Sequence, residues 1–454
     1  MLEYDLDRDE FGRKLNEVVS PAQPIQSIEY LVGREGELSR IEKALYAPGR
    51  HIFIYGDRGV GKSSLAATAA NQFQSGDANY IDAAGSPDAT LKSIVANIGY
   101  QALSASRVRK TKESKSATLD LRYLKLGLSQ EVTPQDLYAE IHSLSDAVEI
   151  LREVGAIHSD RPIVVVDEFD RIKDPVERSL FSDLLKHLGD KKVDLKFIFT
   201  GVAKTLDELL GAHQSAIRQL ETIELPKLSW DARWDIAIAA TRAFGLELDK
   251  EIYIRIAAVS DGYPYYVHLI AEKLLWRVFE DPQRIKQIAW PHYYDALRDA
   301  IESINAELRR PYDVAVNQRS DDYEEVLWST ADSEYLLRYL KDMYSSYQYV
   351  MQQRRDRTVL DYDKYTARIR SLKQKSCGEV LVPDRTKAGL YSYKEKMLRG
   401  YVRMQAEAHG VLLVGEQSAQ APRPRMHVPA SAGRGYYGPS IPKGVHLGRK
   451  RKGS

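Results

Sequence analysis

The sequence predicts an α/β fold with a mostly parallel, doubly wound sheet, followed by two smaller domains and a tail. Between residues 35 and 225, short apolar runs alternate with helical patterns, as expected for parallel strands separated by helices. From Trp230 to about Leu308 the pattern is only helical. From Gly415 onward proline, glycine, serine and arginine dominate, which predicts disorder.

The same patterns divide the chain into five segments. We expect residues 1–28 to be a polar lead-in, in which Pro21 and Pro24 break any helix. The predicted segments are a lead-in at 1–28, an α/β core at 29–228 with an insertion at about 105–132, a helical domain at 229–330, a third compact domain at 331–414 and a disordered basic tail at 415–454.

The core elements are predicted in chain order from apolar spacing. Leu38, Ile41 and Leu45 share one face of a helix, and the run 162–166 (PIVVV) is typical of a strand buried on both faces. Residues 105–117 are polar and basic, which favours an exposed insertion, and 118–132 alternate as in a hairpin. We expect helices at 35–46, 62–73, 137–155 and 180–188, and strands at 51–55, 79–83, 162–166, 195–199 and 222–225.

Composition and charge limit the class of protein. The chain has 454 residues, 43% hydrophobic and 28% charged, as in ordinary globular proteins, and one cysteine, Cys377, excludes a disulfide framework or a zinc site built on several cysteines. The N-terminus has no apolar core for a signal peptide, and no apolar run approaches the roughly 18 residues that span a bilayer. We therefore expect a cytoplasmic protein without a membrane segment.

The net charge of +1 conceals two differently charged parts. Residues 364–454 hold 19 Lys and Arg against five Asp and Glu, whereas residues 1–363 hold 46 against 59. Such asymmetry predicts a polyanionic partner for the basic end, although a solvated basic tail is the alternative for residues 449–452 (RKRK).

A glycine-rich loop follows the first predicted strand and opens a helix. Gly56-Asp57-Arg58-Gly59-Val60-Gly61-Lys62-Ser63 matches G-x-x-x-x-G-K-[ST] in full, and Ser64 follows it. The glycines let main-chain amides surround a phosphate, with the helix dipole in support. Lys62 is expected to reach the β- and γ-phosphates and Ser63 to bind Mg²⁺. This loop predicts ATP and Mg²⁺ as cofactors.

Two carboxylates end the buried strand at 162–166. Asp167 stands where such a strand presents a Mg²⁺ ligand, and Glu168 is placed to orient or deprotonate the attacking water. A helix cap is the alternative role for a carboxylate here, above all for Asp170.

Together these motifs resemble the AAA+/STAND group of P-loop ATPases, and in particular its replication-initiator branch, over about residues 30–415. The resemblance begins with Val32-Gly33-Arg34-Glu35, which looks like the segment over the adenine and makes Gly33 and Arg34 candidate nucleotide-binding residues. It makes the helical domain a lid, in which Pro264 of Gly262-Tyr263-Pro264 abuts the nucleotide. No sensor-2 arginine is evident there, which favours slow hydrolysis and a nucleotide switch.

Two further residues take roles only through this resemblance. Thr200 stands at the sensor-1 position, where many members have asparagine, and a threonine that merely ends a strand is the alternative. Arg218 looks like an arginine finger that acts on a neighbouring subunit's nucleotide, which implies a homo-oligomer, and a surface arginine is the alternative.

The third domain carries a basic helix and a basic hairpin. In 361–374 the apolar Tyr365, Ile369 and Leu372 share one helical face, and a hairpin is predicted around Pro383-Asp384-Arg385. Helices with a basic hairpin resemble the winged helix of initiator-type ATPases, which predicts duplex DNA as a partner, with protein contact as the alternative. The candidate DNA-binding residues are Lys364, Arg368, Arg370, Lys373, Lys375, Arg385 and Lys387.

Two functions therefore remain open. The first is a DNA-associated ATPase whose nucleotide state sets DNA affinity or assembly. The second is a STAND-type signalling or defence switch that oligomerises and holds a separate effector protein, since no effector domain is evident on the chain.

Overall fold

The computed structural model describes residues 6–21, 23–76, 78–110, 122–124, 132–202, 218–317, 322–385 and 387–413. Two compact units contain these residues: Gln23–Pro226 form one, and Met1–Ala22 with Lys227–Ser454 form the other. The predicted tail at 415–454 and most of the predicted hairpin at 118–132 lie outside the described residues.

The unit Gln23–Pro226 is built on a five-stranded parallel sheet, as predicted. The strand order is β2-β3-β4-β1-β5, and the register pairs Val166 with Phe199 and Ile54 with Thr200. This order brings the carboxyl ends of β1, β3 and β4 to one edge of the sheet. The strands are β1 (His51–Tyr55), β2 (Ile81–Asp82), β3 (Ile163–Val166), β4 (Lys196–Gly201) and β5 (Leu220–Glu224).

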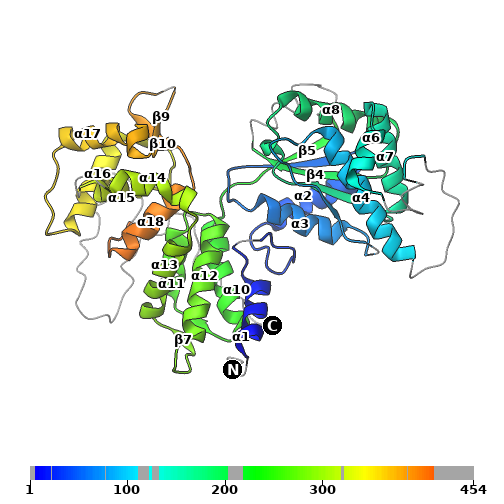
Figure 1. Cartoon of the computed structure of the whole chain (residues 1–454). Coiled ribbons are helices and arrows are strands. Elements are labelled where there is room, and N and C mark those ends of the chain that lie inside the picture. Colours follow the sequence, from blue (N-terminus) through cyan, green and yellow to red (C-terminus); the bar gives the residue numbers. More distant parts are fainter. Residues whose placement is uncertain are drawn as a thin grey trace. The chain divides into compact units, whose positions relative to one another are not determined.

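Helices cover both faces of this sheet (Figure 1). One apolar core joins Phe53, Val166 and Phe199 of the strands to α4, α7 and α8. On the other face, α2 and α3 pack on β1. The helices of this unit are α2 (Glu35–Tyr46), α3 (Lys62–Phe73), α4 (Leu91–Lys110), α6 (Pro134–Glu140), α7 (Leu144–Ile157), η1 (Phe169–Arg171) and α8 (Pro175–Asp190).

Two expectations about this unit are wrong. The single helix predicted at 137–155 is two helices, because Ser143 caps α7 and exchanges hydrogen bonds with Asp146 in a capping box. The insertion predicted from residue 105 begins later, because α4 continues to Lys110.

The first part of the other unit is helical, as predicted for the lid. Its helices are α10 (Trp230–Ala243), α11 (Lys250–Val259), α12 (Pro264–Phe279), α13 (Trp290–Ser303) and α14 (Ala306–Val316). A two-stranded parallel ladder of β6 (Glu247–Leu248) and β7 (Gln287–Ile288) accompanies them.

The lead-in also contains a helix of this unit, which the sequence analysis did not expect. Helix α1 (Arg8–Val18) buries Phe11, Leu15 and Val18, and Asp7 with Glu10 forms a capping box at its start. Pro21 and Pro24 do not prevent it, because they follow the last helical residue.

The C-terminal elements contain a three-stranded antiparallel sheet of order β8-β10-β9. Strands β9 and β10 form the hairpin predicted around Pro383, and α17 lies within the helix predicted at 361–374. The elements are α15 (Tyr323–Ala331), β8 (Arg338–Tyr339), α16 (Leu340–Gln352), α17 (Tyr362–Ser371), η3 (Lys375–Cys377), β9 (Leu381–Pro383), β10 (Leu390–Tyr393) and α18 (Leu398–Ala408).

Candidate functional site

The predicted phosphate loop joins β1 to α3. Gly59 and Gly61 have φ of 77° and 95°, a left-handed conformation that glycine adopts without strain. A Cβ on Gly56 would lie 2.5 Å from the main-chain oxygen of Leu225, so a larger residue would push the loop away from β5. No side chain caps α3, so the first main-chain amides of this helix receive no side-chain hydrogen bond at the loop. The arrangement suits an anion at the start of α3.

Lys62 holds the two ends of this loop together. Its ammonium donates to the main-chain oxygens of Gly56, at 3.2 Å, and Asp57, at 3.0 Å. Burial lowers the pKa of Lys62, and the carboxylates of Asp170 and Asp167 offset part of that effect. Lys62 is thus a cation in a partly desolvated loop, the position from which phosphate oxygens would be bound.

Three residues predicted to act at the site, Ser63, Asp167 and Thr200, are joined by hydrogen bonds at one carboxylate oxygen. The Ser63 hydroxyl donates to Asp167 Oδ1 at 3.0 Å, and the Thr200 hydroxyl donates to the same atom. They come from the start of α3, the end of β3 and the end of β4. The sheet order therefore assembles the predicted metal ligands and the predicted sensor.

The pair Ser63 and Asp167 fits Mg²⁺. Adjacent ligands in an octahedron with metal–oxygen distances of 2.0–2.1 Å lie about 2.9 Å apart, close to the separation of these two oxygens. Mg²⁺ in ATPases takes one or two protein oxygens and completes its shell with water and phosphate. This chain would hold it through the Ser63 hydroxyl and the Asp167 carboxylate.

Glu168 has a fixed main chain and a half-exposed side chain. Its amide donates to Asp167 Oδ1 and to Thr200 Oγ1, both at 3.0 Å, and its φ is 50°. Its carboxylate accepts from Arg171 at 2.8 Å, and the two side chains are 50% and 54% exposed. Exposed ion pairs contribute about 1 kcal/mol or less, so Glu168 can leave Arg171 at little cost.

The side chains of Arg34 and Ser64 form hydrogen bonds with main-chain atoms of the protein. The Arg34 guanidinium, in a side chain 4% exposed, donates to the main-chain oxygens of Val60, at 3.0 Å, and Pro226, at 2.6 Å. Burial lowers its pKa, and Glu37 offsets part of the effect. Ser64 Oγ accepts from the amide of Ile25 at 3.1 Å. Arg34 therefore fixes the phosphate loop through Val60, and a direct contact with nucleotide stays a prediction for both residues.

The other candidates for the nucleotide lie in loops and turns. Gly33 has φ of 74°, and Asp57 and Arg58 belong to the phosphate loop with partly or fully exposed side chains. Arg218 is exposed and stands two residues before β5. Pro264 is the first residue of α12, in the other unit. The roles proposed for Arg218 and Pro264 stay predictions. Asp170 does not cap the next long helix, whose N-cap is Asp174.

The basic residues of the C-terminal elements differ in their exposure and in whether other protein groups bind them. Arg368 pairs with Asp322 at 2.9 Å and covers the Tyr323 ring, so it is largely committed to the fold. Lys364 is exposed and 3.5 Å from Asp361, and Lys373 lies 5.5 Å from the Tyr391 ring centroid. The exposed cations at the end of α17, in η3 and in the β9–β10 hairpin are Arg370, Lys375, Arg385 and Lys387.

Comparisons with known proteins agree with this geometry. Residues 30–198 match the AAA ATPase domain family. A Walker-type ATPase of Pyrococcus abyssi shares the fold with a TM-score of 0.52 at 16% identity, over 84% of this chain and 99% of that one. No curated protein matches the chain.

Two further solved structures are similar at lower scores. Cdc6p of Pyrobaculum aerophilum has a TM-score of 0.41 at 16% identity, over 87% of this chain and 97% of its own. The Orc1 protein of Aeropyrum pernix, solved in complex with DNA, has a TM-score of 0.42 at 15% identity, over 83% and 94%.

Residues 30–198 thus combine a match to the AAA ATPase domain family with a phosphate site, in a chain that has the P-loop ATPase fold. The protein is an ATPase. None of its described helices is both long and apolar enough to cross a membrane.

Proposed function

We propose that this protein is a slow ATPase switch, whose nucleotide state controls its assembly and its engagement of duplex DNA through a C-terminal winged helix. The observation that carries the DNA-binding part is the set of exposed cations on α17, η3 and the β9–β10 hairpin, on an element order typical of winged helices.

At the phosphate site, each residue has a distinct task. Lys62 and the loop amides bind the β- and γ-phosphates, and Ser63 with Asp167 would hold Mg²⁺, which would neutralise charge on the transferred phosphoryl group. The Thr200 hydroxyl holds the Asp167 carboxylate and the Glu168 amide in place by a hydrogen bond to each. Glu168 leaves Arg171 to orient a water molecule for attack on the γ-phosphate and to accept its proton.

These roles are tested by two substitutions and a control. Lys62→Ala is expected to abolish nucleotide binding, because it removes the ammonium that is assigned to the β- and γ-phosphates. Glu168→Gln is expected to bind ATP normally and to lose hydrolysis. Lys43→Ala, an exposed lysine of α2, should change neither. Normal hydrolysis by Glu168→Gln would show that Glu168 is not the base.

The winged-helix proposal rests on the order α15, β8, α16, α17, β9, β10 and on the antiparallel sheet β8-β10-β9. In such a domain α17 would enter the major groove and the residues between β9 and β10 would contact the flanking backbone. Because Arg368 is held by Asp322, we assign phosphate contacts mainly to Arg370, Lys375, Arg385 and Lys387, with Lys364 and Lys373 beside them.

The DNA-binding proposal is tested with a variant in which Arg370, Lys375 and Arg385 are all alanine. Each lost phosphate contact should reduce the slope of log K against log[salt] by about 1, so a change of about 3 is expected in fluorescence anisotropy with duplex DNA. The matched control replaces the exposed Arg152, Lys186 and Arg298 by alanine. Equal slopes for the two triple variants would contradict the assigned interface.

One observation favours the alternative, a switch that holds a separate effector protein. Tyr335, Leu337 and Tyr339 are 67%, 47% and 47% exposed, and they run along edge strand β8 and the residues before it. Exposed apolar residues at a sheet edge are typical of protein contacts. Size-exclusion light scattering with ADP, with ATP and with duplex DNA separates the two functions: assembly that follows ATP alone and ignores DNA favours the effector-holding switch.

A further inference from the structure

The chain after β2 continues to pair with the segment that carries the two carboxylates of the site. The amide of Ala83 donates to the main-chain oxygen of Val165 at 2.8 Å, and the amide of Gly85 donates to that of Asp167 at 2.7 Å. Both bonds lie within one compact unit. The loop that follows β2 therefore runs beside β3 beyond the point where β3 ends, and it reaches the main chain of the proposed metal ligand.

Gly85 lies too close to this segment to carry a side chain. It is buried, and a Cβ on it would lie 2.4 Å from the main-chain oxygen of Glu168, 3.0 Å from the carbonyl carbon of Glu168 and 3.2 Å from the main-chain oxygen of Asp167. The φ of Gly85 lies outside the left-handed region, so space and not backbone conformation excludes a larger residue. Ordinary contact begins at 3.4 Å, so an alanine would displace the Glu168 main chain by about 1 Å.

The main chain that Gly85 contacts is that of the proposed base. Glu168 has a left-handed φ of 50°, a conformation that costs a residue with a side chain roughly 1–3 kcal/mol and persists only where the surroundings hold it. Its amide is held by Asp167 and Thr200. Its carbonyl group lies against Gly85 and accepts from the amide of Arg171 at 2.8 Å. Contacts on both sides of Glu168 thus fix the direction in which its side chain leaves the main chain.

We propose that Gly85 is a positioning residue for ATP hydrolysis, because its lack of a side chain lets Glu168 keep the backbone conformation that directs its carboxylate toward the attacking water. The three atoms nearest to a Cβ at this position belong to Asp167 and Glu168, and none belongs to the phosphate loop. A side chain on Gly85 should therefore affect hydrolysis and not nucleotide binding. The inference rests on the proposed role of Glu168 as the base.

Gly85→Ala tests the inference by separating nucleotide binding from hydrolysis. The variant is expected to lower kcat about 100-fold, because a displacement of about 1 Å at a catalytic group has an effect of that size. The Kd of a fluorescent ATP analogue, measured with Mg²⁺, is expected to stay unchanged. An unchanged kcat, or an increase of Kd as large as the decrease of kcat, would overturn the inference.

A double-mutant cycle with Glu168→Gln shows whether Gly85 acts through Glu168. In the Glu168→Gln background, Gly85→Ala should lower the single-turnover rate no further, because the group that it displaces is already lost. Equal fold-losses in the two backgrounds would give Gly85 a general structural role and contradict the inference. Normal hydrolysis by Glu168→Gln alone would refute the proposed base and the inference with it, whereas an inactive Glu168→Gln beside a fully active Gly85→Ala would refute the inference only.

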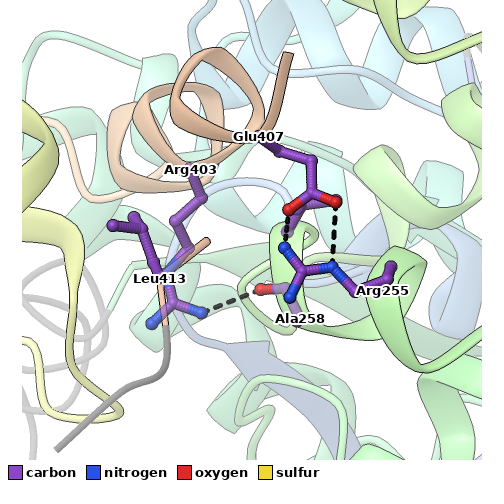
Figure 2. A pocket seen from close by; sticks show the side chains of 6 residues that line it. Arg255, Ala258, Arg403, Glu407 and Leu413 are labelled. Carbon is purple, nitrogen blue, oxygen red and sulfur yellow. Dashed lines mark hydrogen bonds and ion pairs between the residues drawn. The ribbon is translucent and has the colours of Figure 1, made fainter. Parts of the chain in front are cut away.

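Two controls separate positioning from a loss of stability. Gly155→Ala places a Cβ 2.8 Å from the main-chain oxygen of Asp194, which precedes β4 at the opposite end of the strands from the site. Glu407→Gln breaks a buried pair in the other compact unit, where Arg255 Nε donates to Glu407 Oε1 at 2.8 Å and the carboxylate side chain is 2% exposed (Figure 2). Both variants should lower the melting temperature and leave kcat unchanged. A decrease of kcat in either control to the level of Gly85→Ala would reduce Gly85 to a structural role and overturn the inference.

Pro87→Gly keeps the test decisive if Gly85→Ala does not fold. Pro87 restricts the loop two residues after Gly85, and its main-chain oxygen accepts from the amide of Lys173 at 3.3 Å, a bond that glycine can keep. The more mobile loop should hold the Glu168 main chain less firmly and lower kcat by about threefold, with Kd unchanged. A kcat for Pro87→Gly equal to that of the wild type would then overturn the inference.

Discussion

At the residue scale, the site is organised around single atoms whose partners are distant in sequence. Thr200 shows this best: its hydroxyl joins the Asp167 carboxylate to the Glu168 amide, across two neighbouring strands. The resemblance to AAA+ proteins indicated the position, but a threonine that merely ends a strand was an equal interpretation of the sequence. The contact with Asp167 supports the sensor position, and the sensing role itself stays a proposal.

The sequence did not reveal which protein atoms the candidate arginines bind. The ligand contacts of Arg34 and Arg368 stay predictions, but the structure adds protein partners: Arg34 binds the main-chain oxygens of Val60 and Pro226, and Arg368 pairs with Asp322. Motif position and helical periodicity show which side of an element a residue occupies. They do not show a partner 192 or 46 residues away, and that partner decides whether a cation is free.

Buried His268 predicts a pH dependence of stability. It lies on α12, is 3% exposed, and its Nδ1 has no hydrogen-bond partner within the described residues. Burial lowers its pKa from 6.5 to about 4. Between these values the unfolded chain binds a proton that the folded chain does not, so the free energy of unfolding falls as the pH drops from about 6.5 to 4.

His268→Leu removes this titration. At about 1.4 kcal/mol per pH unit for one proton, the wild type should lose about 3 kcal/mol more stability than the variant between pH 6.5 and pH 4. Urea unfolding followed by tryptophan fluorescence measures this, since all five tryptophans lie between Trp230 and Trp328, in the same unit as His268. His142→Leu, at an exposed position, is the control; parallel pH profiles for wild type and His268→Leu would refute the assignment.

At the element scale, α1 is the clearest case that the sequence analysis missed. The prolines at 21 and 24 favoured a non-helical lead-in, although Phe11, Leu15 and Val18 share one helical face. The signal that could have revealed the helix is the capping box of Asp7 and Glu10. The strands were easier, because β1 and β3 are continuous apolar runs that end at glycine or carboxylate.

Helix α1 anchors the N-terminal segment to α12 and to the end of α10 through one aromatic cluster. Phe11 lies 4.1 Å from the Phe279 ring centroid, 4.8 Å from Trp276 and 5.1 Å from Phe244. A few residues later, Ile25 bonds to Ser64 and Thr68 of α3, the helix that begins at the phosphate loop. The segment from Arg8 to Ile25 therefore has one anchor in each compact unit.

Phe11→Ala is expected to destabilise the compact unit that contains α1 by about 3–5 kcal/mol, because it removes a buried ring and leaves a cavity. Tryptophan fluorescence during urea unfolding reports this directly, since Trp276 contacts the ring. Glu17→Ala, an exposed position on the same helix, should change stability by less than about 0.5 kcal/mol. A midpoint for Phe11→Ala that coincides with the Glu17→Ala midpoint would mean that α1 is not anchored as described.

At the scale of the whole molecule, the excess of basic residues near the C-terminus comes from two segments, and it includes both buried and exposed cations. Of the 19 Lys and Arg in residues 364–454, 11 fall in 364–413 and eight in 414–454. Within 364–413, Arg399 and Arg403 are buried on Asp261 and on main-chain oxygens, so they are unavailable to an external polyanion. The composition alone could not separate these internal cations from exposed ones such as Arg370.

Removal of residues 414–454 separates the two possible sources of DNA affinity. The chain should remain folded when it ends at Leu413, because the last described contacts, between Leu412 and the Gln353 side chain, are kept. The eight tail cations can contribute up to about 7 units to the slope of log K against log[salt], and the exposed cations of α17, η3 and the hairpin about 4.

The truncated chain should therefore still bind duplex DNA at low salt, with a slope of about −4, and its ATPase activity should match that of the full chain. Anisotropy titrations from 50 to about 200 mM salt measure the slopes. The Arg370, Lys375 and Arg385 triple variant, made in the truncated chain, should lower the slope to about −1. If the truncated chain has no affinity at low salt, the tail is the source of DNA binding, and the proposed winged helix would be left as a surface for protein contact.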